Sequence, residues 1–137
     1  ARQAFASESA TQATVEELLR LDPPLHLFAR HALEEVEFAG VRLRRGEKIG
    51  LLLGAANRDP DRFSEPDVFK PGRTPNPHVS FGAGIHFCVG APLARLELAV
   101  ALPILFARLP SLRLAGQPRY RDSFHFHGLE ALKVEWP

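Results

Sequence analysis

The sequence is short of several features that would assign a protein to a class. A single cysteine among 137 residues excludes an intrachain disulfide and fits a reducing compartment, so we expect a cytoplasmic protein. Seventeen basic and sixteen acidic residues leave a net charge of +1, which indicates neither a nucleic-acid nor an anionic-membrane partner. No apolar run is long enough to span a bilayer, and no signal peptide or internal repeat is recognisable.

What is present is ordinary for a globular chain. Hydrophobic residues make up 45% and charged residues 24% of the sequence, and the length predicts one domain. Twelve prolines and ten glycines predict much irregular, turn-rich chain.

The only cysteine, Cys88, lies in a glycine-rich stretch directly ahead of an apolar helical pattern. Gly82, Gly84 and Gly90 allow tight turns and a close approach to a flat partner. Pro92 favours the first turn of a helix, whose free N–H groups and dipole would favour the thiolate form of the cysteine. The thiolate is the form that binds metal, yet a lone cysteine is also often a small core residue. A metal or nucleophile role and a structural role stay equally open on these grounds.

The spacing is more specific. Phe81, Gly84, Cys88 and Gly90 fit the pattern F-x-x-G-x-x-x-C-x-G, and His86 stands two residues before the cysteine. This pattern closely resembles the heme-binding loop of the cytochrome P450 family in its bacterial, soluble form.

The resemblance implies roles for the loop. Cys88 would be the proximal ligand to the iron of heme b, where a thiolate donates electron density that favours O–O cleavage. Phe81 would pack beside the sulfur, and Gly82 and Gly90 would belong to the same cofactor-binding loop. Backbone N–H groups after the cysteine would hydrogen-bond its sulfur. His86 would face a heme propionate, the alternative being an ordinary loop histidine.

Upstream, the residues Thr14 to Glu17 read as a capping box that starts a helix, which should stop at the prolines after Asp22. Residues 1–13 are expected to be a lead-in, either frayed helix or disordered, and residues 14–137 the C-terminal heme-binding portion. From their spacing alone, Glu17 and Arg20 would form an ordinary ion pair on the helix surface. The resemblance instead makes them the family's buried E-x-x-R pair, which ties this helix to an irregular meander.

Two further arginines receive roles from the resemblance. Arg30 would pair with a heme propionate, which suits its planar guanidinium, unless it faces solvent. Arg73 would complete the network of the E-x-x-R pair, unless it is a solvated loop residue. It lies in the long proline-rich segment 55–77, which matches the family's meander.

Residue patterns predict the remaining elements. They indicate a hairpin around Ala39-Gly40, a strand over 49–53, and a mostly buried helix over 91–109 that kinks at Pro103. Alternation predicts short strands at 112–114, 124–127 and 132–135. His125 and His127 share one face of such a strand, but no third metal ligand is apparent, so a metal site is not favoured.

Together these features predict an α+β, mainly α fold: the C-terminal part of the cytochrome P450 fold. The implied function is a heme-thiolate monooxygenase that uses O2 to hydroxylate a small organic substrate, with electrons from a ferredoxin- or flavoprotein-type donor. The family's distal acid–alcohol pair has no counterpart in residues 1–13, so we expect a truncated chain that is inactive alone, and we assign no catalytic residue. The alternative is a heme-free, non-catalytic fragment that forms a homo-oligomer through exposed apolar surface.

Overall fold

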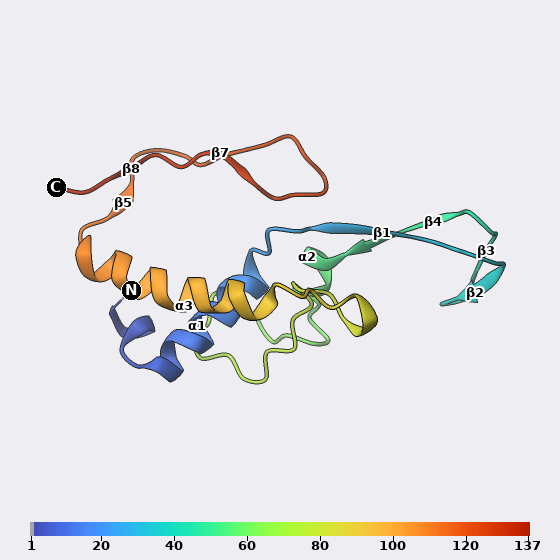
Figure 1. The fold of residues 1–137 in the computed structure, drawn as a ribbon, viewed down its shortest axis with the longest axis horizontal. Coiled ribbons are helices and arrows are strands. Elements are labelled where there is room, and N and C mark those ends of the chain that lie inside the picture. The colour runs from blue at the N-terminus through green and yellow to red at the C-terminus, as the bar shows by residue number, and fades with distance from the viewer. Residues whose placement is uncertain (1) are drawn as a thin grey trace.

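A computed structural model describes residues 2–137 as helices joined to small antiparallel sheets (Figure 1). The helices are η1 (Arg2–Phe5), α1 (Glu8–Leu21), α2 (Leu53–Ala56), η2 (Gly84–His86) and α3 (Ala91–Arg108). The strands are β1 (Leu27–His31), β2 (Val36–Phe38), β3 (Val41–Leu43), β4 (Lys48–Leu52), β5 (Arg113–Leu114), β6 (Arg119–Tyr120), β7 (Leu129–Ala131) and β8 (Val134–Glu135). The predicted α+β class is therefore confirmed.

Helix α1 begins earlier than the sequence pattern indicated. Its N-cap is Ser7, whose Oγ accepts a hydrogen bond from the Ala10 N–H at 3.2 Å. The predicted cap, Thr14, is a buried residue inside the helix, and its hydroxyl donates to the Ala4 carbonyl at 2.8 Å. The capping box at Thr14 is therefore wrong, because the burial of that face lets the helix extend back to Glu8.

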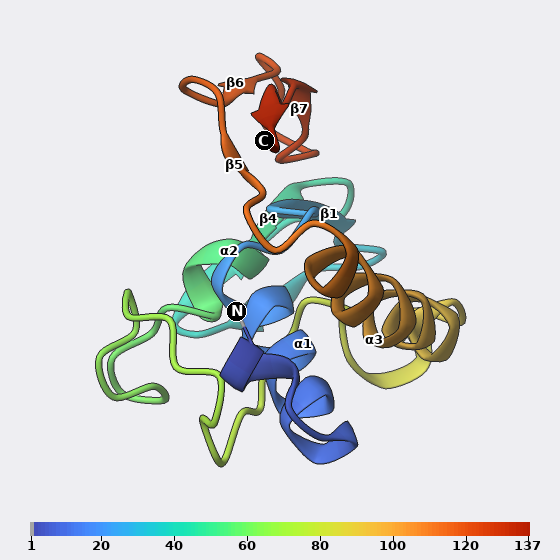
Figure 2. The same cartoon turned by 90° about the vertical axis from the view of Figure 1, so that its left-hand side faces the viewer.

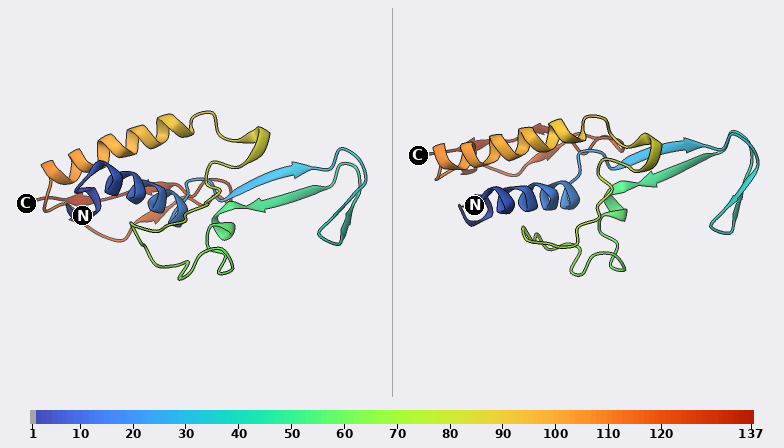
Figure 3. Two further views of the ribbon diagram at one scale, coloured as in Figure 1. Left: turned by 90° about the horizontal axis from the view of Figure 1, so that it is seen from below. Right: turned by 60° about the horizontal axis from the view of Figure 1, so that its bottom comes forward.

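Helices α1 and α3 lie side by side, as two views show (Figures 1 and 3). Phe5 before α1 stacks on Phe106 of α3 with ring centroids 5.7 Å apart. Helix α3 has the predicted length and continues through Pro103. The prediction that it is mostly buried is wrong: Leu93 and Leu96 are each 59% exposed, since no element within residues 2–137 covers these side chains. No described helix is both long and apolar enough to cross a membrane.

The two hairpin-like sheets project away from the helices (Figure 1). Strands β1 and β4 pair antiparallel, with Leu27 opposite Leu52 and Arg30 opposite Ile49. Strands β2 and β3 form the predicted hairpin, whose turn residues Ala39 and Gly40 both have positive φ, of 51° and 76°. That geometry matches the right-handed twist of a two-residue hairpin.

The C-terminal strands form a separate layer beyond the helices (Figure 2). Strand β5 pairs with β8, and β6 pairs with β7. The strand predicted over 124–127 is largely wrong, since this segment makes only a single bridge, between Phe126 and Leu25. It nevertheless connects the C-terminal layer to the chain between α1 and β1.

The interior is small and contains an unusual share of polar groups. Its buried apolar residues include Val15, Leu19, Leu53 and Phe63, and Glu17, Arg20 and Asn57 are fully buried beside them. Buried charges are costly unless they are paired and hydrogen-bonded. The contacts of these three residues therefore fix how α1 meets the meander.

Candidate functional site

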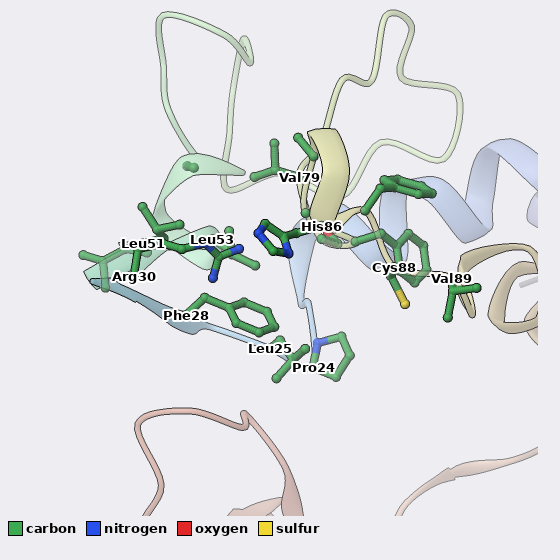
Figure 4. A pocket seen from close by; sticks show the side chains of 17 residues that line it. Pro24, Leu25, Phe28, Arg30, Leu51, Leu53, Val79, His86, Cys88 and Val89 are labelled. Atoms are coloured by element: carbon green, nitrogen blue, oxygen red, sulfur yellow. The ribbon is translucent and has the colours of Figure 1, made fainter. Parts of the chain in front are cut away.

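The main cavity has a volume of about 940 Å³ and lies between the β1–β4 ribbon, α2 and the loop that carries Cys88 (Figure 4). Its volume falls in the range of small-molecule and cofactor sites. The lining residues are mostly apolar: Pro24, Leu25, Phe28, Arg30, Leu51, Leu52, Leu53, Ala56, Val79, Ser80, Phe81, Gly82, Ala83, His86, Phe87, Cys88 and Val89.

The cysteine loop folds through two left-handed glycines. Gly82 and Gly84 have φ of 72° and 65°, a conformation that costs residues with a Cβ. The Cys88 N–H donates to the Phe81 carbonyl at 2.9 Å and closes the loop. The sequence therefore needs glycine at these two positions to bring the cysteine back toward Phe81.

Cys88 is exposed, lines the cavity and precedes the first turn of α3. The side chain is not buried in this chain, which argues against a structural-core role. Gly90 is different from the other loop glycines: its φ is −83°, and a Cβ there would meet the Cys88 Sγ at 3.8 Å, an ordinary contact. The structure places Gly90 behind the cysteine, outside the cavity lining.

An arginine and a histidine reach the same cavity. Arg30 comes from β1 and His86 from η2, and Figure 4 shows both projecting into the space that Phe28 also borders. Arg30 donates to the carbonyl of Ala29 at 3.0 Å, and its guanidinium lies over the Phe28 ring at 5.9 Å from the centroid. Five of the six predicted cofactor-binding residues thus surround one cavity.

The E-x-x-R pair is buried, so the surface alternative is wrong. Arg20 donates to both carboxylate oxygens of Glu17, and its Nη1 donates to the carbonyls of Asn57 and Pro66. Arg73 Nε lies 3.1 Å from each Glu17 oxygen, and its side chain is only 6% exposed. The prediction that Arg73 completes this network is confirmed.

Electrostatics keep Glu17 ionised. Burial alone would raise the pKa of its carboxyl, but hydrogen bonds from Arg20, the Lys70 N–H and Arg73 outweigh burial and lower that pKa. A negative Glu17 between two arginines holds α1 against the meander.

Sequence analysis missed a second polar cluster that reaches the cysteine loop. Glu16 accepts two hydrogen bonds from Arg95 of α3, at 2.6 and 2.9 Å, and one from His78 at 3.0 Å. The Arg95 guanidinium lies 4.6 Å from the centroid of the Phe81 ring. The spacing along the chain gives no signal of these contacts, since Glu16 and Arg95 come from different helices.

Another missed residue is Asn57, although the segment N-R-D-P contains it. Its side chain accepts the Val79 N–H at 2.8 Å and donates to Ser80, whose hydroxyl donates to the Leu19 carbonyl at 2.7 Å. A fully buried asparagine thus ties the start of the meander to the start of the cysteine loop. Through the carbonyl of Leu19, α1 also binds the start of the cysteine loop.

Comparison with known proteins agrees with this geometry. The family model for cytochrome P450 matches residues 9–118. The chain is 53% identical over 121 residues to the biotin biosynthesis cytochrome P450 of Bacillus subtilis, covering 88% of this chain and 31% of that protein. It is 43% identical to a mycinamicin IV hydroxylase/epoxidase of Micromonospora griseorubida, covering 98% and 35%.

Solved structures give the same answer. P450BioI in complex with an acyl carrier protein carrying hexadec-9Z-enoic acid has a TM-score of 0.92 and 48% identity, covering 98% of this chain and 35% of that one. CYP109E1 from Bacillus megaterium with testosterone has a TM-score of 0.90 and 36% identity, covering 97% and 38%. The chain therefore spans about a third of the length of these relatives. On the family match and these likenesses, it belongs to the cytochrome P450 family.

Proposed function

We propose that this chain is the heme-binding portion of a monooxygenase and that Cys88 ligates the iron. The observation that carries the proposal is the exposed Cys88 at one end of an apolar cavity whose other lining includes Arg30 and His86. A lone thiol suits a soft metal centre, and a guanidinium suits a carboxylate.

The residues present fit heme b, a flat apolar ring with iron at its centre and two carboxylates on one edge. Val89 lines the cavity and is 99% exposed, and Phe87 is 50% exposed, so a large apolar ligand would cover surface that is otherwise open to water. The thiol of Cys88 supplies the donor for iron, while Arg30 and His86 supply groups for the carboxylates. Gly82 borders the cavity without a side chain to obstruct the ring.

The chain's own residues prepare this site. Cys88 lies just before the N-terminus of α3. Phe81 is fixed by Arg95, and Arg95 by Glu16, so the loop is anchored on α1. When bound, the heme would supply oxygen activation and transfer of one oxygen atom to a substrate.

The reaction we propose for the whole protein is O2-dependent hydroxylation of a small organic substrate, with a ferredoxin- or flavoprotein-type electron donor. Its support is the family membership and the names of relatives, one of which is a hydroxylase/epoxidase. One related structure holds a fatty-acyl carrier protein and another a steroid. In line with the acyl chain and the steroid, we propose a largely apolar organic substrate for this protein.

A heme titration tests the proposal. Purified chain mixed with hemin, reduced and exposed to carbon monoxide should show the red-shifted Soret band that thiolate ligation produces. Cys88→Ser should abolish that band, because a hydroxyl replaces a thiolate poorly. Ser111→Ala, an exposed substitution after α3, serves as the control and should keep it. An unchanged spectrum in Cys88→Ser would remove this cysteine from the site.

The alternative remains a heme-free fragment that self-associates. The observation behind it is the exposed apolar face of α3, which includes Leu93, Leu96 and Val100. A reduced carbon monoxide spectrum no different from that of free hemin, together with a dimer or larger species in light scattering, would favour it over heme binding.

A further inference from the structure

Two histidines and an aspartate that play no part in the heme cavity converge at a second place in the fold. Asp22 is the C-cap residue of α1, His26 precedes β1, and His127 lies between β6 and β7. Among residues 2–137, these three can each offer one ligand atom, and the three atoms lie within 4.8 Å of one another. The partners that could bind a metal ion together with His127 are therefore Asp22 and His26, and not its neighbour His125.

The backbone holds the two histidines on neighbouring extended segments. The His26 N–H donates to the His125 carbonyl at 3.1 Å, and the His127 N–H donates to the Pro24 carbonyl at 2.9 Å. The Leu25–Phe126 bridge lies between these bonds. The segments are therefore fixed relative to each other before any side-chain interaction is counted.

The side chains are also confined. The rings of His26 and His127 stack with centroids 4.1 Å apart, and Tyr120 stacks on His127 at 4.2 Å. Gly54 leaves room for His26, because a Cβ there would stand only 3.3 Å from its ring. The group borders a cavity of about 470 Å³ that also includes Arg58.

The donor chemistry suits a borderline cation. Imidazole nitrogen and carboxylate oxygen are ligands of Zn²⁺ and its neighbours, and three protein ligands leave one position for water. Two ligands of a tetrahedral zinc ion lie about 3.3 Å apart. His127 Nε2 and Asp22 Oδ1 already lie 3.3 Å apart. The His26 and His127 rings are nearly parallel, so at least one of them must turn before both lone pairs point to the same ion.

The local charges allow this. The Arg58 guanidinium is engaged elsewhere, since it donates to the Asp67 carboxylate at 2.6 Å and to the Leu21 carbonyl at 2.7 Å.

We propose that Asp22, His26 and His127 form a site for one divalent transition-metal ion of the zinc type. Bound metal would fasten the C-terminal layer to the end of α1. The site stands apart from the heme cavity, with which its own cavity shares only Leu52 as a lining residue. Its role is therefore structural, and it does not depend on the function proposed above.

Isothermal titration calorimetry tests the site. The chain is first freed of metal with a chelator and is then titrated with Zn²⁺. Cys88→Ser is the background for all samples, so that the exposed thiol cannot bind the ion. We expect one ion per chain. His26→Gln, His127→Gln and Asp22→Asn should each weaken binding by more than the roughly 10- to 100-fold that loss of an outer-shell partner costs. The control is His31→Gln, an exposed histidine of β1, which should bind like the parent.

Tight one-site binding that survives His127→Gln would overturn the proposal. So would parent binding no tighter than that of a variant that carries all three substitutions at Asp22, His26 and His127. A second measurement remains informative if a variant fails to fold. Co²⁺ added to the Cys88→Ser chain should give the visible bands of a tetrahedral nitrogen–oxygen site, and their absence would equally overturn it. Zn²⁺ should also raise the melting temperature of this background but not of a folded Asp22→Asn variant in the same background.

Discussion

Glu17 and Arg20 bind each other through two parallel hydrogen bonds, of 2.8 and 2.9 Å, with both side chains fully buried. Taking two charges out of water costs several kcal/mol per ion. The pair is retained because every part of it has further partners: Arg20 reaches three carbonyls of the meander, and Glu17 accepts hydrogen bonds from Arg73 and the Lys70 N–H. One turn of α1 thereby organises a segment with almost no regular structure.

Removing one partner of the buried pair should strongly destabilise the fold. Arg20→Ala leaves a buried carboxylate with Arg73 as its remaining cationic partner and is expected to lower the free energy of unfolding by roughly 3–5 kcal/mol. Urea denaturation measures this loss. Arg113→Ala is the matched control, because Arg113 pairs with Glu135 at 2.7 Å on the surface, with both side chains more than half exposed. Its loss should lie within about 1 kcal/mol. Equal losses in the two variants would contradict the role assigned to the buried pair.

Acid should weaken the contact between α1 and α3. The Arg95 hydrogen bonds lower the pKa of Glu16 below its ordinary value of 4.5, against the opposing effect of burial. The unfolded chain therefore takes up the proton at a higher pH than the folded chain, and stability is lost as pH falls below 4.5.

Glu16→Gln should remove this dependence. The free energy of unfolding would be measured by urea denaturation from about pH 6 to 3.5. In the variant it should fall less steeply with pH than in the parent, and the difference in slope should correspond to at most about one bound proton. The exposed Glu34→Gln is the control and should follow the parent curve. Parallel curves for Glu16→Gln and the parent would show that the Arg95 contact is not formed in solution.

Heme affinity should depend on Arg30 and His86 without changing the iron ligand. Arg30→Leu removes a charge-assisted hydrogen bond worth about 1.5–3 kcal/mol, so heme should dissociate roughly 10- to 100-fold more readily. His86→Leu should act in the same direction. The Soret position of the bound fraction should not move in either variant. Arg45→Leu, in an exposed turn, is the control; if all three variants retain parental affinity, neither residue contacts a propionate.

The two glycines of one matched pair should respond oppositely to alanine. Gly84 has φ of 65° with nothing within 4 Å of the position of a Cβ, so Gly84→Ala tests backbone strain alone. It should cost about 1–2 kcal/mol. Gly72 has equally open surroundings without a positive φ, and Gly72→Ala should be neutral or stabilise by up to about 1 kcal/mol. Thermal denaturation of both variants distinguishes the two effects.

The sequence pattern located the elements better than their ends or their burial. The β2–β3 hairpin, the strand before α2 and the helix after the cysteine are where local residue patterns indicated. The start of α1 is not, because Thr14 is a good capping residue by type, but the neighbouring packing buries it and moves the cap to Ser7. The pattern of neighbouring residues cannot show that tertiary packing buries Thr14.

By itself the sequence determined the cysteine loop: the spacing of Phe81, Gly84 and Cys88 specifies both its turns and its family. The signal is strong because glycine adopts a positive φ at little cost and only cysteine supplies a thiol. Only the tertiary structure decided which charged residues meet. Glu16 finds Arg95 on another helix, and His127 finds Asp22 and His26 across the fold. Such pairings depend on how elements distant in the chain pack, and no spacing along the sequence encodes them.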